Sequence, residues 1–166
     1  MIAANTEQSA KMQDRAVPSA WRGGAPRIIA FCCNYCAFAA ADLAGSRRMQ
    51  YPAGVRIIHT PCTGKLEMEH ILDAFEKGVD GVLVVGCLEG GCHYVEGNLR
   101  ARKRIDRIRS ILDEIGIGGS RLQMVNLSDA MAPAFVQHVR GIVETVKALG
   151  PSPIRALEQT ESAGKV

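Results

Sequence analysis

The length, composition and charge of the chain exclude several classes of protein. With 166 residues, of which 47% are hydrophobic and 5% aromatic, the chain is long enough for one domain with a mainly aliphatic core. Its net charge of +3 is too small for a domain that depends on phosphate contacts, so we expect no nucleic-acid partner.

No segment of the sequence has the character of a signal peptide or a membrane helix. Residues 1–25 contain no continuous apolar run, and nowhere do apolar residues continue for the roughly 18 positions that a spanning helix needs. We therefore expect a cytoplasmic protein without membrane insertion. In a reducing compartment, the six cysteines indicate metal binding or redox chemistry rather than structural disulfides.

Short apolar strands alternate with amphipathic or alanine-rich helices along the chain. Continuous apolar runs predict the strands, and apolar residues at helical spacing predict the helices. Ser128 is the predicted N-cap of the last helix, and Gly150 follows its end. In chain order the elements are a strand at 27–32, a helix at 37–43, a strand at 55–60, a helix at 66–77, a strand at 81–86, a helix at 95–115, a strand at 121–127 and a helix at 136–149.

This alternation predicts a small doubly wound α/β domain. Strands that are apolar throughout and joined by helices specify a parallel sheet covered on both faces. Right-handed crossovers favour the strand order 2-1-3-4, which is a flavodoxin-like arrangement. We assign residues 26–150 to this domain, residues 1–25 to a mobile N-terminal tail and residues 151–166 to a C-terminal tail.

All six cysteines lie in three segments that directly follow predicted strands. Because the carboxyl ends of neighbouring parallel strands share one edge of the sheet, the order 2-1-3 brings these three segments together. Cysteines that served only as small core residues would not all fall in three such loops. In strand order the cysteines are Cys32, Cys33 and Cys36, then Cys62, then Cys87 and Cys92.

Several chemistries use clustered thiols, and the spacing separates them. A thiol phosphatase would need Arg six positions after a cysteine, which the sequence lacks. A thiol–disulfide catalyst would use Cys33 and Cys36 alone, and a structural zinc site usually has two Cys-x-x-Cys pairs where this chain has one. An iron–sulfur cluster takes four thiolates, and the spacings of Cys33 with Cys36 and of Cys87 with Cys92 both occur in such sites. The sequence favours the cluster, with a thiol–disulfide enzyme or a zinc-stabilised adaptor as the alternatives.

Glycines surround the third cysteine segment. Without side chains, Gly86, Gly90 and Gly91 allow the backbone to approach inorganic sulfide closely and to donate N–H groups to it. We therefore add these three residues to the candidate cofactor site.

Four segments resemble one known family, the delta subunit of methyl-viologen-reducing hydrogenase. They are residues 31–45, 61–64, 78–87 and 92–98, and the likeness covers about residues 27–150 in the family's order and spacing. The resemblance implies one [2Fe–2S] cluster, and it is the resemblance that selects this type over [4Fe–4S]. It also implies electron transfer between a hydrogenase or formate dehydrogenase module and a flavoprotein of the heterodisulfide reductase A type, with the catalysis belonging to those partners.

Carried over by position, the resemblance also implies a ligand set. Since a cluster takes four protein ligands, one of the five matching cysteines is spare. Cys32 is set aside, because neighbouring side chains on a strand point to opposite faces. The chain departs from the family pattern at Tyr35, where Trp is common, and at Gly91, where Asp often precedes the last cysteine. The implied metal ligands are Cys33, Cys36, Cys62, Cys87 and Cys92.

A few other residues invite a functional interpretation. His93 adjoins a cysteine, but enough thiols are present without it, and His59 fits an edge strand. Residues 99–109 carry six positive charges, which indicate a solvated helix face or a docking face for an acidic partner. Lys65 and Thr63 are candidate donors to the cluster or to a partner. We expect no nucleotide cofactor, since the sequence lacks a Gly-x-Gly-x-x-Gly or Walker loop.

Overall fold

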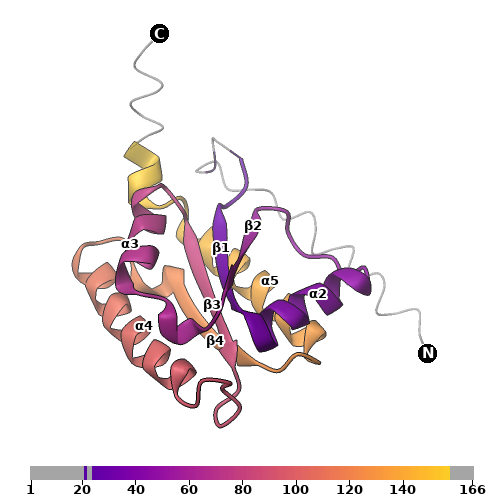
Figure 1. Cartoon of the computed structure of the whole chain (residues 1–166). Coiled ribbons are helices and arrows are strands. Elements are labelled where there is room, and N and C mark those ends of the chain that lie inside the picture. The colour runs from indigo at the N-terminus through magenta and orange to yellow at the C-terminus, as the bar shows by residue number, and fades with distance from the viewer. Residues whose placement is uncertain (1–20, 22–23, 158–166) are drawn as a thin grey trace.

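Four strands and the helices between them form the part of the chain that the structure, a computed structural model, describes: Trp21 and residues 24–157. The strands are β1 (Ile28–Cys33), β2 (Val55–Thr60), β3 (Gly81–Cys87) and β4 (Leu122–Leu127). The long helices are α2 (Ala39–Ser46), α3 (Met68–Glu76), α4 (Gly97–Glu114) and α5 (Ala132–Leu149), as Figure 1 shows. A π-helical turn η1 (Asn34–Phe38) and the 3₁₀ turns η2 (Thr63–Lys65) and η3 (Gly119–Arg121) complete the chain of elements.

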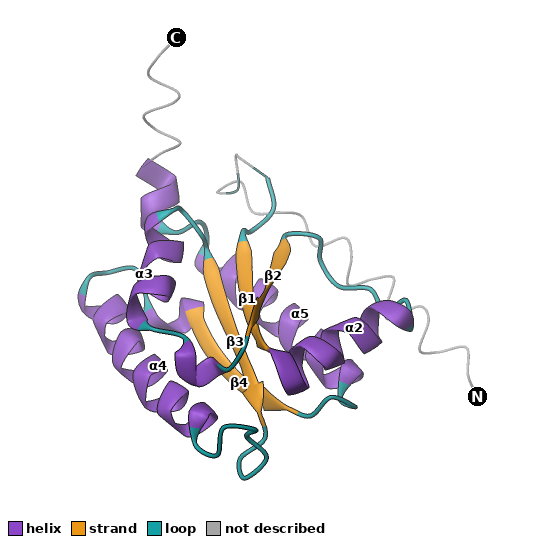
Figure 2. Cartoon of the chain, in the orientation of Figure 1, coloured by secondary structure: helices purple, strands orange, loops and turns teal. Residues whose placement is uncertain are grey.

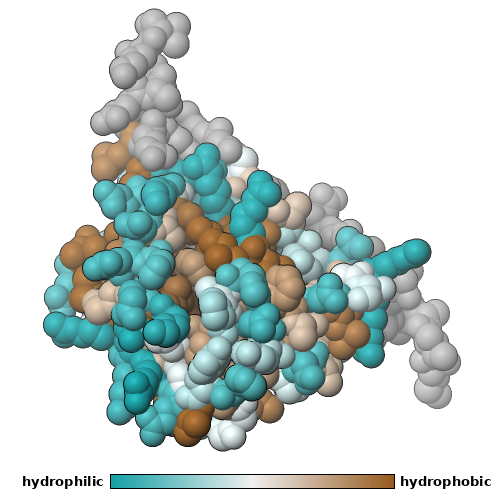
Figure 3. Space-filling model, in the orientation of Figure 1, coloured by the Kyte–Doolittle hydropathy of each residue, from teal (hydrophilic) through white to brown (hydrophobic). Residues whose placement is uncertain are grey.

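The strands form one parallel sheet in the order β2-β1-β3-β4 (Figure 2), which confirms the predicted α/β fold and strand order. β1 and β3 are the inner strands, and every residue of β3 is buried. A strand buried on both faces needs apolar side chains at every position, which explains the uninterrupted run at 81–86. β2 forms one edge of the sheet, and its Ile58 is 39% exposed. Figure 3 shows hydrophobic surface exposed on this side of the molecule.

Helices cover both faces of the sheet. α2 and α5 pack on one face around Phe135, Val139 and Ile142, while α3 and α4 pack on the other around Ile71 and Ile108 (Figure 1). The two hydrophobic layers hold the strands in register, so the loops at the carboxyl edge of the sheet start from fixed positions.

The predicted helix starts differ from the observed ones, and for α5 and α4 the reason is local. α5 begins at Ala132 with Met131 at the N-cap position, because Pro133 presets the first turn. Ser128 lies outside the helix, and its N–H donates to Met131 Sδ at 3.4 Å. α4 begins at Gly97, two residues later than the pattern indicated, because Val95 has a φ of +64°, which interrupts helical geometry.

Asp80 joins the two ends of the described chain at the amino edge of the sheet. Its carboxylate is fully buried, accepts hydrogen bonds from the N–H groups of Arg27 at 2.8 Å and Ser152 at 2.9 Å, and forms an ion pair with Arg155. The Arg155 guanidinium also lies 5.5 Å from the ring centroid of the buried Trp21. This network ties the segment before β1 and the segment after α5 to the sheet.

The residues after α5 are therefore packed in part. Residues 153–157 are helical, and both Ser152 and Arg155 are buried, although the sequence pattern assigned 151–166 to a tail. Most of the predicted N-terminal tail and residues 158–166 lie outside the described residues.

The buried ion pair gives a prediction about stability. We expect Asp80→Asn to lower the free energy of unfolding by about 3–5 kcal/mol, because it leaves the Arg155 charge buried without its counter-ion. The matched control is Asp73→Asn, which breaks the exposed Asp73–Lys77 pair and should cost less than about 1 kcal/mol. Urea titrations followed by circular dichroism measure both, and similar small losses in the two variants would contradict the assignment.

Candidate metal centre

The structure brings five of the six cysteines together at the carboxyl edge of the sheet. The sulfurs of Cys33, at the end of β1, and Cys87, at the end of β3, lie 3.4 Å apart. The Cys36 thiol, on η1, hydrogen-bonds the same Cys87 sulfur. Cys62, just before η2, forms a second pair with Cys92, just before α4. The five candidate ligands named from the sequence are thus neighbours in space.

Cys32 stands apart from this cluster. It is fully buried in the core on the α2 and α5 side of the sheet. Burial, with a smaller contribution from the adjacent Cys33 thiolate, raises the pKa of Cys32 to about 12. Burial raises the pKa of the Cys87 thiol as well, so the raised pKa alone does not separate Cys32 from the candidate ligands.

The clustered thiols differ in how easily they ionise. Burial is the main cause that raises the pKa values of Cys36, Cys62 and Cys87 above the ordinary value. Burial acts in the same direction on Cys92, but hydrogen bonds from the backbone outweigh it and lower the pKa of this thiol. The donors are the N–H groups of Asn98, Tyr94 and Gly97. Two of them open α4, so the positive end of a helix faces the sulfur.

The sulfurs form two groups, one of Cys33, Cys36 and Cys87 and one of Cys62 and Cys92. Within residues 24–157, no three Cys, His, Asp or Glu side chains are grouped so as to hold a single metal ion. Two thiolates on one tetrahedral metal at about 2.3 Å would lie roughly 3.8 Å apart, close to the 3.4 Å between Cys33 and Cys87. A cluster with two metal ions takes two protein ligands at each, so paired thiols suit it better than they suit one zinc ion.

Two asparagine side chains hold the third cysteine loop. Asn98, which is buried, donates to the carbonyl oxygens of Cys87 at 3.0 Å and Leu88 at 2.9 Å. Asn126, at the end of β4, donates to the Cys87 carbonyl at 2.5 Å and accepts from Arg102. Sequence reasoning missed both asparagines, since no motif links them to the cysteines they support.

Arginines of the basic segment 99–109 have structural partners as well as solvent. Arg104 donates to the carbonyls of Gly64 at 3.3 Å and Leu66 at 2.6 Å, and it pairs with Glu67 at 3.5 Å. It therefore fastens the loop that carries Cys62 to α4. The other exposed charged residues of this segment lie on the solvent-facing side of α4, as predicted.

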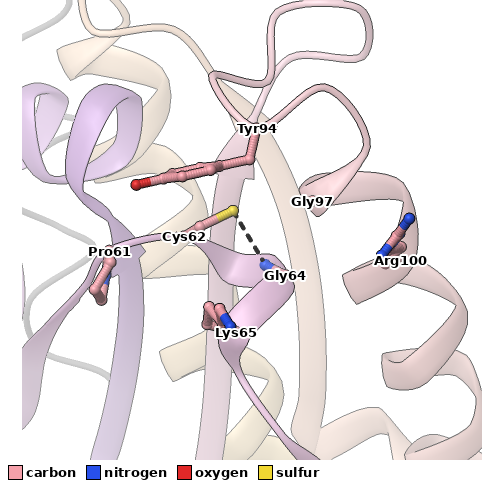
Figure 4. Close-up of a pocket in the computed structure, with 7 residues that line it drawn as sticks. All are labelled: Pro61, Cys62, Gly64, Lys65, Tyr94, Gly97 and Arg100. Atoms are coloured by element: carbon pink, nitrogen blue, oxygen red, sulfur yellow. Dashed lines mark hydrogen bonds between the residues drawn. The ribbon is translucent and has the colours of Figure 1, made fainter.

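Aromatic rings connect the first and third cysteine loops. The Tyr35 ring stacks on His93 with centroids 3.9 Å apart, and Tyr94 meets both rings edge-on. Tyr94 also lies over the Cys62 sulfur (Figure 4). His59, predicted as an edge-strand histidine, lies in β2 and hydrogen-bonds Asn34 Oδ1 through Nε2 at 2.6 Å.

The glycine at which an added methyl group would come closest to the sulfurs is not one of the three named from the sequence. A methyl group at Gly86 would meet Thr63 Oγ1 at 3.3 Å, whereas Gly90 is needed for its φ of +76° and Gly91 has ordinary contacts. A methyl group at Gly97 would overlap the Cys62 Sγ and lie 3.2 Å from the Cys92 Sγ. Only a residue without a side chain fits between these sulfurs. Gly97 lies in segment 92–98, which carries part of the family resemblance, but the sequence pattern does not predict its contact with Cys62.

A pocket of about 490 Å³ opens beside Cys62 (Figure 4). The Gly64 N–H donates to the Cys62 sulfur at 3.3 Å within it. We call it the Cys62 pocket; its lining residues are Pro61, Cys62, Gly64, Lys65, Tyr94, Gly97 and Arg100.

The fold and the thiol cluster define a small α/β domain with a candidate metal centre at the carboxyl edge of its sheet. The family model described as "Methyl-viologen-reducing hydrogenase, delta subunit" matches residues 28–150, and the chain belongs to this family.

Two kinds of curated relative support this membership. The chain is 50% identical over 131 residues to the D-type iron-sulfur subunit of the vhu F420-non-reducing hydrogenase of Methanocaldococcus jannaschii, covering 79% of this chain and 98% of that one. It is also 39% identical over 126 residues to the corresponding D-type subunit from Archaeoglobus profundus, covering 76% and 92%. A different relative, the A-type subunit of the ferredoxin/F420H2-dependent CoB–CoM heterodisulfide reductase of Methanosarcina acetivorans, is 38% identical over 133 residues, which are 80% of this chain but 17% of that protein.

Among the described residues, the structure has no helix that is both long and apolar enough to cross a membrane.

The position of Gly97 gives a prediction about metal content. We expect Gly97→Ala to lower the metal bound per chain by most of its wild-type value, because the new methyl group displaces the Cys62 and Cys92 sulfurs. Gly141→Ala, on α5 with nothing within 4 Å of the added carbon, is the control, and it should keep the metal and gain about 0.5–1 kcal/mol of stability. Elemental analysis and thermal melts measure the two effects; full metal content in Gly97→Ala would contradict this account.

The backbone donors at Cys92 predict a difference in reactivity. In the metal-free chain, we expect iodoacetamide to label Cys92 at a lower pH than Cys36, since the two thiols are similarly accessible but the pKa of Cys92 is lowered and that of Cys36 raised. Cys32 should stay unlabelled at both pH values. Peptide mass spectrometry after brief labelling across a pH series measures the order, and labelling of Cys36 first would reject it.

Proposed function

We propose that the chain is an electron-transfer subunit that carries one [2Fe–2S] cluster at the carboxyl edge of its sheet. Four of the five clustered thiols hold the cluster, and the fifth is spare. The observation that carries the proposal is the meeting of five cysteines from three loops, in a chain whose family and relatives are hydrogenase iron–sulfur subunits. The candidate ligands are Cys33, Cys36, Cys62, Cys87 and Cys92.

The residues present fit such a group chemically. When bound, the cluster would take up and release one electron at a time. The thiolates supply the iron ligands, and the pairing of the sulfurs suits two metal ions. Backbone N–H groups near Gly97 donate to the Cys92 sulfur, and such hydrogen bonds stabilise added negative charge. Gly86, Gly90 and Gly91 leave room for backbone near the inorganic sulfides.

The partner assignment rests on the domain's occurrence in a longer protein. The A-type heterodisulfide reductase chain of Methanosarcina acetivorans contains a segment homologous to this protein within its own polypeptide. A domain that is fused to such a chain in one organism and separate in another is expected to work beside it in both. We therefore propose that this chain passes electrons between a hydrogenase or formate dehydrogenase module and a flavoprotein of the heterodisulfide reductase A type. We place this activity in the cytoplasm, where thiols stay reduced.

A colourless zinc protein or a thiol–disulfide enzyme is the alternative, and a spectrum of the anaerobically purified chain separates them. We expect broad visible charge-transfer bands that bleach on addition of dithionite, with two irons and two sulfides per chain, because four thiolates complete a [2Fe–2S] core. Cys92→Ser should lose these bands. The matched control, Cys32→Ser, should keep them, since Cys32 is buried in the core and is not one of the five candidate ligands.

Iron analysis and electron paramagnetic resonance of the reduced protein complete the measurement. A zinc-containing chain without visible bands would refute the proposal, as would full iron retention in both Cys87→Ser and Cys92→Ser, since only one of the five thiols is spare. Four irons per chain would keep the electron-transfer role and correct the cluster type.

A further inference from the structure

The Cys62 pocket places a clustered thiol beside positively charged side chains. Lys65 and Arg100 line it and both are exposed (Figure 4), and Arg100 also forms an exposed ion pair with Glu96 at 3.4 Å. Its other walls are apolar or backbone, and exposed apolar side chains continue the surface outward: Val95 is 79% exposed and Leu99 43% exposed. An exposed apolar surface bordered by charged side chains is typical of a protein interface and not of a core.

The charge around the cysteine edge is unevenly distributed. On the pocket side, the basic face of α4 continues from Arg100 to Lys103 and Arg107, which are exposed. On the far side of the edge, a second hollow between α2 and the loop before α5 is lined by Asp42 and Asp129. A partner with an acidic surface is attracted to the first side and repelled by the second, so it approaches in one orientation.

We infer that an acidic electron-transfer protein docks over the Cys62 pocket and exchanges electrons with this chain through Cys62. The inference rests on the proposed function, which supplies the cluster, and deepens it by naming the surface and the partner's charge. An apolar side chain of the partner fills the pocket, and its carboxylates face Lys65 and Arg100. One electron leaves the reduced cluster and enters the partner's oxidised centre, and no covalent bond forms or breaks between the two proteins.

The Cys62 end of the cluster suits this exchange better than the Cys87 end. Both thiols are buried, Cys87 at 1% and Cys62 at 4% exposed, but Cys62 lines the pocket, under the ring of Tyr94. The loop is also held firmly, since Arg104 donates to two of its carbonyls. A fixed loop keeps the distance between the two redox centres constant once a partner is seated.

The test uses flavodoxin, an acidic flavoprotein, as the partner probe and the full chain reduced with dithionite. Stopped-flow absorbance follows flavin semiquinone formation, in which the flavin gains one electron from the cluster and a proton from solvent. At low salt we expect Lys65→Glu and Arg100→Glu each to slow the second-order rate about tenfold, and added salt to slow the wild type. Lys77→Glu makes the same charge change at the opposite edge of the sheet, where Lys77 pairs with Asp73, and should change the rate less than about twofold.

A basic probe, cytochrome c, supplies the opposite expectation. The two pocket variants should react with it faster than the wild type does, because the barrier of like charges has been removed. Equal losses in Lys65→Glu and Lys77→Glu, or rates toward flavodoxin that ignore salt, would overturn the docking surface.

Two further measurements separate this inference from the proposed function. Calorimetric titration of oxidised flavodoxin into the chain reports docking without any electron transfer, so weaker binding in Lys65→Glu supports the surface even if the chain holds no cluster. Unchanged binding in both pocket variants overturns it even if the cluster is present. Light scattering detects a dimer of this chain; if Lys65→Glu dissociated such a dimer, the occupant would be a second copy and the inference would be wrong.

Discussion

The carbonyl of Cys87 is the constraint on which the site depends. It ends β3, the fully buried inner strand, at a point where water does not reach and a backbone acceptor still needs a donor. Asn98 of α4 and Asn126 of β4 supply that donor together. Satisfying one carbonyl thus fixes the start of α4 and the end of β4 relative to the cysteine, and Arg102 extends the same chain of hydrogen bonds along the helix.

The first turns of α4 then organise the other cysteine loops. Gly97 fits between the sulfurs of Cys62 and Cys92, and its backbone lies so close to Gly64 that a methyl group there would be only 2.7 Å from the Gly97 Cα. Arg104, two turns further on, holds the Cys62 loop by its carbonyls. One helix thus touches the loops of Cys62, Cys87 and Cys92, and the polar contacts set a spacing that apolar packing alone would leave loose.

The sequence predicted what depends on short-range pattern and missed what depends on contacts between distant positions. The strand order follows from apolar runs and right-handed crossovers, and the place of the thiols follows from the strand order. The roles of Asn126 and Gly97 were not predicted, because Cys87 and Cys62, which they contact, lie far from them in the sequence. The prediction of Ser128 as the N-cap was wrong because a serine near a helix start resembles a cap, whereas Pro133 decides where α5 begins. The packing of residues 151–157 depends on Asp80, whose partner Arg155 is separated from it by 75 positions.

The two edges of the sheet bury different ionisable groups, an ion pair at the amino edge and thiols at the carboxyl edge. This difference explains their different roles. At the amino edge, Asp80 and Arg155 neutralise each other, so the pair is complete within the chain and serves stability. At the carboxyl edge, burial is the main cause that raises the pKa values of Cys36, Cys62 and Cys87, so ionising these thiols is unfavourable there. Thiolates so placed are stabilised by a bound metal group, which makes binding of that group and the ordering of the loops one process. The amino edge is thus neutralised within the chain, and the proposed cluster would do the same for the thiolates at the carboxyl edge.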